Sequence, residues 1–184
     1  MNLNRRDLLL GGAALCLPQT VFAATEPFVV DPAFVPQQVR VNRRLEPGQI
    51  IVVTKEHFLY LVTGKGKAMR YGVGVGKSGL SFQGQAVIER KAKWPSWRPT
   101  AEMIRRSPKY AKYANGVPGG PNNPLGARAL YLYQNGRDTY FRIHGTTDPS
   151  SIGRSVSNGC IRMINEHVTD LYERVPVGTT VHVI

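Results

Sequence analysis

The chain has 184 residues, with 24 lysine and arginine residues against 12 aspartate and glutamate residues, and a formal net charge of +12. An apolar share of 42% is typical of a soluble globular protein and argues against a disordered chain or one that fills a membrane. A chain of this length can form one ordinary domain whose core needs no disulfide or metal for stability. The positive charge attracts polyanions, which include nucleic acid, acidic lipid and anionic polymers of the cell envelope.

Residues 1–23, MNLNRRDLLLGGAALCLPQTVFA, have the pattern of an export signal. The basic pair Arg5-Arg6 precedes an apolar run at residues 8–17, and a small-residue cleavage site follows at Ala23. A membrane span needs roughly 20 apolar residues, so we expect the run to be removed with the signal and not retained as an anchor. The two arginines resemble a twin-arginine signal, and a signal of the general secretory (Sec) type is the alternative.

Cleavage after Ala23 would leave a single cysteine, Cys160, because Cys16 lies within the signal. One thiol cannot form an internal disulfide. In an exported protein it is either a buried small apolar residue or a free reactive group, and its sequence neighbours must decide between these.

Strand signals dominate the chain after an irregular start. Three prolines interrupt residues 24–46, which we expect to form an extended arm or linker, and a single folded domain is expected at residues 47–184. Runs of β-branched and aromatic residues predict strands at residues 49–54, 58–63, 68–75, 86–92, 127–133, 139–143 and 179–184. Residues 164–175 have the apolar spacing of a short helix.

Residues 94–125 break the strand pattern. Residues 101–116 have helical spacing and several positive side chains, whereas prolines and glycines exclude regular structure from the stretch that follows. A long irregular loop in a compact domain is usually functional or disordered, and we expect a basic cap over a cleft. The fold class predicted is a mostly β domain of sandwich or barrel type, with one or two short helices.

Residues 144–162, HGTTDPSSIGRSVSNGCIR, hold the side chains best suited to catalysis. A thiol near its unperturbed pKa of roughly 8.5 is only about 3% ionised at pH 7. A histidine partner such as His144 can lower that pKa and supply a proton to a leaving amine. Gly159 lets the backbone approach a substrate, and Arg162 offers a cation for carboxylates or an oxyanion. This pattern favours Cys160 as a nucleophile.

The same segment resembles the signature of the L,D-transpeptidase (YkuD-type) family, in which HG[ST] is followed, after a spacer, by serine, a residue like histidine or asparagine, and G-C-[IV]-R-[ML]. Other similar stretches are PGQIIVV at 47–53, WPSWRPT at 94–100, PNNPLG at 121–126, YFRIHGT at 140–146 and VPVGTTVHV at 175–183. The family most often has histidine where this chain has Asn158, so proton transfer here would depend on His144 alone.

The resemblance implies a cysteine acyl-enzyme mechanism on peptidoglycan. Cys160 would attack the third residue of a stem tetrapeptide, the terminal D-alanine would leave, and an amine would capture the thioester. The other site residues that it implies are Gly145 and Thr146, one of whose carbonyls orients His144, Gly159 in the oxyanion region, and Ser157, Asn158, Arg162 and Trp97 near the substrate.

The resemblance also limits the partners. It implies no metal and no organic cofactor, and the histidines are too scattered for a zinc site. The acyl acceptor can be a second stem or the lysine of an outer-membrane lipoprotein. We expect an exported monomer in the periplasm or cell envelope, without a transmembrane span after processing, that carbapenems acylate.

Three alternatives remain open at this point. Water as acceptor would make the protein an L,D-carboxypeptidase, and an inert cysteine would leave a non-catalytic peptidoglycan-binding module on the same fold. A basic nucleic-acid binder is the third alternative, against which the export signal argues.

Overall fold

The computed structural model describes residues 28–184, so the expected export signal lies outside the described residues. The strands are β1 (Gln37–Arg40), β2 (Ile50–Val53), β3 (Phe58–Gly64), β4 (Lys67–Gly72), β5 (Val75–Gly76), β6 (Gly84–Lys93), β7 (Arg128–Gln134), β8 (Arg137–His144), β9 (Ser155–Ser157), β10 (Ile161–Arg162) and β11 (Thr180–Val183). Two α-helices, α1 (Ala101–Arg106) and α2 (Asn165–Arg174), accompany short 3₁₀ turns at Pro32–Phe34, Thr54–Glu56, Pro108–Tyr113 (η3) and Pro149–Ser151.

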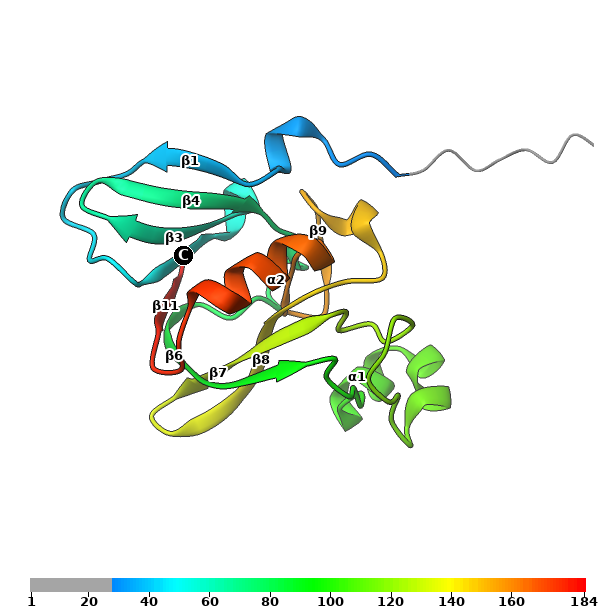
Figure 1. Ribbon diagram of the computed structural model, residues 1–184. Coiled ribbons are helices and arrows are strands. Elements are labelled where there is room, and N and C mark those ends of the chain that lie inside the picture. Colours follow the sequence, from blue (N-terminus) through cyan, green and yellow to red (C-terminus); the bar gives the residue numbers. More distant parts are fainter. Residues whose placement is uncertain (1–27) are drawn as a thin grey trace, which may run out of the picture.

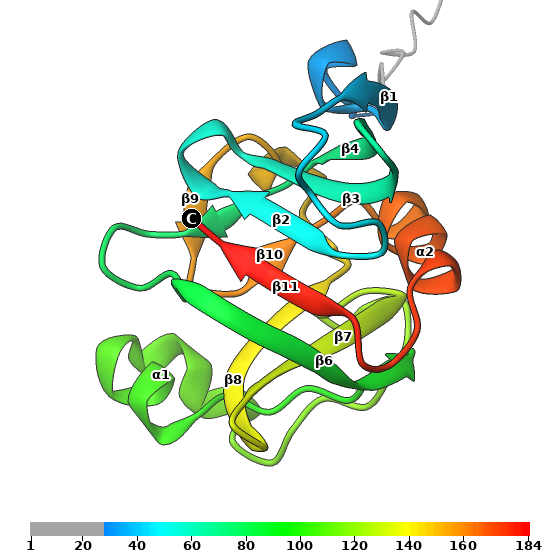
Figure 2. The same cartoon turned by 90° about the vertical axis from the view of Figure 1, so that its left-hand side faces the viewer.

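Nine strands form one mixed sheet in the order β1-β4-β3-β2-β11-β6-β7-β8-β10, and β5 pairs with β9 in a second, small sheet. The large sheet curls, so that α2 lies between the β1–β4–β3 end and the β6–β7–β8 end (Figures 1 and 2). The predicted mostly β architecture with few short helices is therefore confirmed.

Part of the segment that we expected to be an arm belongs to the sheet. Strand β1 pairs antiparallel with β4 and forms one edge of the large sheet. Its four residues alternate between half-buried and exposed, which is a short and weak signal beside Pro36. The pairing of β1 depends on a neighbour that lies some 30 residues later in the chain, so local sequence gave little sign of it.

The inner face of the sheet and one face of α2 form the hydrophobic core. Strands β2, β3, β6, β7 and β11 contribute alternate residues, as the period-two geometry of strands requires. The fully buried members include Ile50, Val52, Leu59, Tyr71, Val73, Ile88, Leu130, Leu132, Ile143, Met163, Val168, Leu171 and Val181. Truncation of a buried leucine such as Leu171 to alanine typically costs about 2–5 kcal/mol.

The expected helix at residues 101–116 is divided into α1 and η3. Thr100 caps α1, with its Oγ1 accepting the N–H of Met103 at 3.1 Å. Pro108 ends α1 because proline lacks the N–H that a continuous helix needs, and the residue before it is forced out of the helical conformation. None of the helices in residues 28–184 combines the length and the apolar character that crossing a bilayer requires.

Candidate active site

Strands β8 and β10 bring the two ends of the motif together. They pair in parallel, with Ile161 opposite Ile143 and Arg162 opposite His144. The two isoleucines are buried in the core, and successive side chains of a strand point to opposite faces. His144 and Arg162 therefore face away from the core, and Cys160, just before β10, lies on their side of the sheet and lines the same cavity.

A cavity of about 330 Å³ separates this face from residues 94–125, which include α1 and η3 and are called the cap below. The sheet side contributes Tyr140, Phe141, Arg142, His144, Cys160 and Arg162, and the cap side contributes Trp97, Arg98, Thr100, Met103, Arg106 and Tyr110. Four of the lining residues are arginines, and none is aspartate or glutamate. Such a cavity attracts anions.

His144 is held in one tautomer by the backbone. Its side chain is 4% exposed, and Nδ1 lies 2.5 Å from the carbonyl oxygen of Gly145. Because a carbonyl only accepts hydrogen bonds, Nδ1 carries the proton, and Nε2 is the acceptor of the neutral ring. Burial lowers the pKa of His144 to about 4, with a further decrease from the charges of Arg162 and Arg142, against the opposing effect of the Gly145 and Leu125 carbonyls.

Asn165, the first residue of α2, packs against the backbone next to His144. Its Oδ1 accepts the N–H of Ala127 at 3.0 Å. A Cβ on Gly126 or on Gly145 would collide with the same oxygen, so both positions exclude side chains. The asparagine thus fills the space between two chain segments and fixes the backbone beside the imidazole. Sequence reasoning gave it no role.

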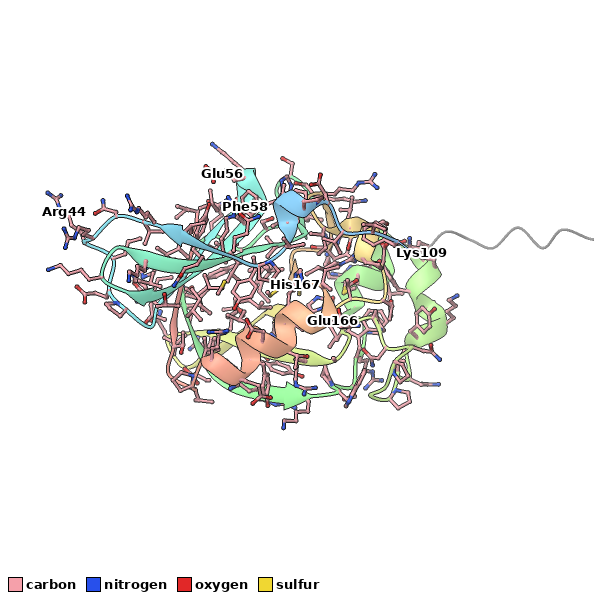
Figure 3. All side chains as sticks on the ribbon, turned by 45° about the horizontal axis from the view of Figure 1, so that its top comes forward. Arg44, Glu56, Phe58, Lys109, Glu166 and His167 are labelled. Atoms are coloured by element: carbon pink, nitrogen blue, oxygen red, sulfur yellow. The ribbon has the colours of Figure 1, made fainter. Side chains whose placement is uncertain are left out.

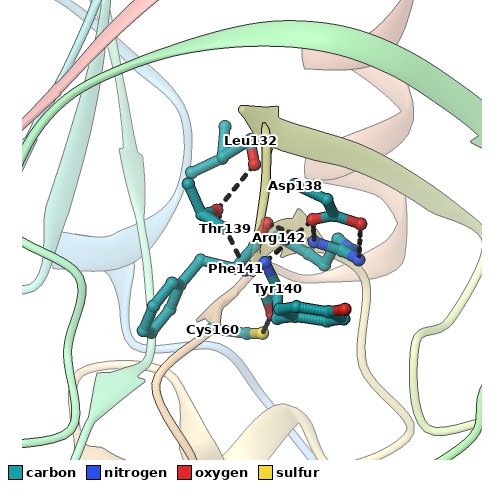
Figure 4. A network of polar contacts seen from close by, with 7 residues as sticks. All are labelled: Leu132, Asp138, Thr139, Tyr140, Phe141, Arg142 and Cys160. Atoms are coloured by element: carbon teal, nitrogen blue, oxygen red, sulfur yellow. Dashed lines mark hydrogen bonds and ion pairs between the residues drawn. The ribbon is translucent and has the colours of Figure 1, made fainter. Parts of the chain in front are cut away.

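Cys160 is half-buried, and its Sγ lies 3.8 Å from the carbonyl oxygen of Tyr140 (Figure 4). Burial raises the pKa of the thiol, whereas the N–H and charge of Arg142 and the charge of Arg162 act in the opposite direction. Among the hydrogen bonds of residues 28–184, none joins Cys160 to His144. Both pKa shifts favour the neutral form of their group, and the two groups are not hydrogen-bonded to each other.

A β-bulge in β8 orients the carbonyl of Tyr140 towards the Sγ of Cys160. The register between β7 and β8 shifts at residues 139–141, and Tyr140 adopts a φ of 61°, the left-handed region that costs a non-glycine residue about 1–3 kcal/mol. Asp138 stabilises this backbone, since its Oδ1 accepts the Tyr140 N–H at 2.8 Å (Figure 4). The same carboxylate binds Arg142 through two contacts of 2.7 and 2.8 Å. Sequence reasoning missed this bulge.

A tight turn presents Cys160. Ser157 Oγ donates to the carbonyl of Cys160 at 2.6 Å and accepts the N–H of Gly159 at 3.0 Å. Gly159 has a φ of +127°, and a Cβ there would lie 2.6 Å from the Leu80 carbonyl oxygen and 2.5 Å from the Phe141 ring. Packing against Leu80 and Phe141 therefore already requires a glycine at position 159. The buried hydroxyl of Ser157 makes its hydrogen bonds within the turn.

A comparison with protein families assigns the chain as a whole. The L,D-transpeptidase catalytic domain (YkuD) model matches residues 47–183. The chain belongs to this family. The "Probable L,D-transpeptidase ErfK/SrfK" of Salmonella typhimurium is 36% identical over 153 residues, which cover 82% of this chain and 48% of the relative. The "Probable L,D-transpeptidase YbiS" of Escherichia coli is 36% identical over 159 residues, with the same coverage. The chain spans about half the length of these curated relatives.

Solved structures agree on the fold. One from Brucella melitensis, described as a "Probable carnitine operon oxidoreductase caia", is 56% identical and covers 82% of this chain and 93% of its own, with a TM-score of 0.58. That description names another activity, whereas the curated relatives are named as L,D-transpeptidases. The Ldtfm-avibactam carbamoyl enzyme is 16% identical, covers 76% of this chain and 49% of its own, and has a TM-score of 0.57. At this level of identity, the similarity shows a shared fold and nothing about function.

Asn158 connects the turn of this L,D-transpeptidase domain to its cap. Asn158 donates from Nδ2 to the hydroxyl of Tyr110, in η3, at 3.0 Å. The Tyr110 ring packs edge-on against Trp97, with 6.0 Å between ring centroids. Trp97 is fixed in turn by two backbone hydrogen bonds with Val117, of 2.9 and 2.7 Å. Asn158 is thus connected to Trp97 through Tyr110, and all three residues line the cavity.

Two further motif residues lie on the loop after His144. The Oγ1 of Thr146 accepts the N–H of Asp148 at 3.0 Å, which shapes the loop. Of the two carbonyls expected near the imidazole, that of Gly145 makes the contact. Arg162 has one long contact with Asp148, 4.0 Å from Nη1 to Oδ2, so its guanidinium remains available to the cavity.

The remaining histidines lie outside the cavity. His57 shares a hydrogen bond of 2.9 Å with Ser155 Oγ, His167 is on α2 and His182 is on β11. Within the part of the chain that the structure describes, no group of three or more histidine, cysteine, aspartate or glutamate side chains is placed to hold a metal ion.

Proposed function

We propose that the protein is a peptidoglycan L,D-transpeptidase that uses Cys160 as its nucleophile and His144 as its general base. The observation that carries the proposal is the shared cavity, in which the thiol and the imidazole both face four arginines. Family membership supports the reaction class, and the geometry supports the assignment of the residues.

In the first half-reaction, the Sγ of Cys160 turns from the Tyr140 carbonyl and bonds to the carbonyl carbon of the third stem residue. The thiol proton passes to Nε2 of His144, the acceptor of the neutral ring. The bond to the terminal D-alanine then breaks, His144 returns the proton to the leaving amine, and a thioester remains.

In the second half-reaction, an amine attacks the thioester carbonyl and gives its proton to His144. The thiolate leaves, takes the proton back, and the free enzyme is restored. Since the N–H of Gly159 is occupied by Ser157, we assign the oxyanion to the backbone N–H of Cys160. Loss of one such donor typically costs about 2.7–4 kcal/mol in other enzymes.

Charge favours a peptide donor that carries carboxylates. Arg98 and Arg106 approach the cavity from the cap, and Arg142 and Arg162 approach it from the sheet. A stem tetrapeptide presents several carboxylates, which planar guanidinium groups bind well. We propose that the stem lies between the two pairs, with its scissile bond at Cys160. Arg98 and Arg162 would bind its carboxylates most directly, because Asp138 already pairs with Arg142 and Glu102 lies 3.6 Å from Arg106.

We propose an exported, monomeric enzyme of the periplasm or cell envelope that transfers the acyl group to a stem amine or to a lipoprotein lysine. Transfer to water, as in an L,D-carboxypeptidase, would use the same thioester. Acylation of Cys160 by carbapenems follows from the same accessible sulfur.

Replacement of the sulfur tests the proposal. Cys160→Ala should fold with an unchanged thermal midpoint and lose D-alanine exchange on a disaccharide tetrapeptide, and Cys160→Ser serves as the matched polar control. Normal exchange by Cys160→Ala would refute the nucleophile, and binding of the muropeptide without any exchange by the wild type would favour the non-catalytic module. Mass spectrometry of sacculi after incubation with the wild type distinguishes the three acceptors, because each adds a different mass.

A further inference from the structure

Positive side chains gather at the end of the molecule opposite the cap. The loop between β1 and β2 and the turn between β3 and β4 meet there, and the cluster, called the basic tip below, consists of Arg40, Arg43, Arg44, Lys65 and Lys67, all exposed. Figure 3 shows Arg44 and Lys109 of the cap at opposite ends of the molecule. The basic tip is therefore remote from the catalytic cavity.

Backbone contacts hold the two segments of the basic tip together. The N–H of Val41 donates to the carbonyl of Gly66 at 3.1 Å, which joins the loop to the turn. Asn42 shapes the loop by accepting the N–H of Arg44 on its side chain at 3.0 Å and the N–H of Leu45 on its carbonyl at 3.1 Å. An asparagine at this position stabilises a tight turn, so the arginines that follow it project outward.

The charges of the basic tip are not neutralised by the protein. Arg40 lies directly opposite Lys67 in the register of β1 and β4, an arrangement of like charges that destabilises a sheet. Within residues 28–184 no ion pair forms to any of the five cations, although Glu46 lies in the same loop. Positive charge on an edge strand can block unwanted strand pairing, but Arg43, Arg44 and Lys65 lie beyond the strands and cannot serve that purpose.

We propose that the basic tip binds the surface of an anionic lipid bilayer. Its cations project from two turns at one end of the molecule, and none of them lines the catalytic cavity. Residues 40–49 and 64–67 contain no aromatic side chain, so the stacking that retains single-stranded nucleic acid is lacking. Separate, exposed cations suit a plane of lipid phosphates, and a protein docked by this end would keep the cap and its cavity directed away from the membrane.

The test compares two triple variants of the full chain. Arg43→Gln, Arg44→Gln and Lys65→Gln remove charge from the basic tip, and the matched control Lys93→Gln, Lys109→Gln and Lys112→Gln removes the same charge elsewhere. Each cation near an anionic membrane contributes about fivefold in affinity. We expect the tip variant to bind vesicles of phosphatidylglycerol and phosphatidylcholine about 100-fold more weakly than the wild type, and the control to change less than about threefold.

Vesicles of phosphatidylcholine alone measure the contribution of apolar segments, and binding due to the tip should vanish at about 1 M salt, where the Debye length is about 3 Å. An equal loss by both triple variants would overturn the proposal, because net charge would then explain it. The proposal would also fail if the tip variant kept its affinity for vesicles but lost affinity for soluble polyphosphate, a result that would indicate a polymer as the partner. Circular dichroism confirms that the variants are folded.

Discussion

Acid should weaken the native state through His144, and the size of the effect can be worked out. The pKa of this histidine is lowered from 6.5 to about 4 by burial. The unfolded chain therefore takes up a proton at a higher pH than the native chain does, and the free energy of unfolding falls as the pH drops from 6.5 towards 4. A difference of about 2.5 between two pKa values corresponds to about 3 kcal/mol, which is lost in that window and fully present above it.

Urea unfolding of the wild type and of His144→Asn at pH 7, 6, 5 and 4 isolates this contribution. The asparagine amide can replace Nδ1 as the donor to the Gly145 carbonyl but does not titrate. We expect the wild type to lose about 3 kcal/mol more than the variant between pH 7 and pH 4, whatever the difference between them at pH 7. Parallel pH profiles would show that the imidazole titrates normally and that the site does not keep it neutral.

Four other predictions follow from the same site. Because burial raises the pKa of Cys160, the rate at which iodoacetamide alkylates it should keep rising with pH beyond the ordinary range of a thiol pKa. A plateau near neutral pH would instead indicate a thiolate–imidazolium pair. Ser157→Ala leaves the Gly159 N–H and the Cys160 carbonyl without their partner, so it should lower the free energy of unfolding by about 1–3 kcal/mol. It should also lower kcat while KM stays nearly unchanged. Tyr110→Phe keeps the ring and loses the hydrogen bond to Asn158, so KM for the donor should rise by up to about tenfold with an unchanged thermal midpoint; an equal fall in kcat alone would contradict a role in substrate binding. Asn165→Ala should cost about 1–3 kcal/mol in urea unfolding and also lower kcat, whereas full activity would show that the backbone beside the imidazole needs no support.

The motif and the larger elements could be predicted because their signals are local. The short strand patterns, the apolar face of α2 and the residues around Cys160 and His144 each depend on a few neighbouring positions. No strand was expected at residues 161–162, so the parallel pairing of β8 with β10, which places the two side chains on one face, could not be predicted.

Other features of the site depend on contacts between distant segments, and sequence reasoning could not find them. The bulge at Tyr140 arises from the register between β7 and β8, and no single residue in the sequence indicates it. The role of Asn165 depends on Gly126 and Gly145, which lie earlier in the chain and meet the asparagine only in the folded state. The contact of Asn158 with Tyr110 likewise joins residues 48 positions apart.

Burial and the neighbouring arginines have different effects on the pKa values of Cys160 and His144, and these effects would change when a substrate binds. Burial is the largest cause of both pKa shifts, and it keeps the thiol of Cys160 and the imidazole of His144 neutral. Arg142 and Arg162 favour the thiolate but disfavour the imidazolium. A bound carboxylate beside these guanidinium groups would offset their charge, so that His144 becomes a stronger base when a substrate is present. The cysteine would then be deprotonated as it attacks, and the free enzyme would not expose a reactive thiolate to oxidants.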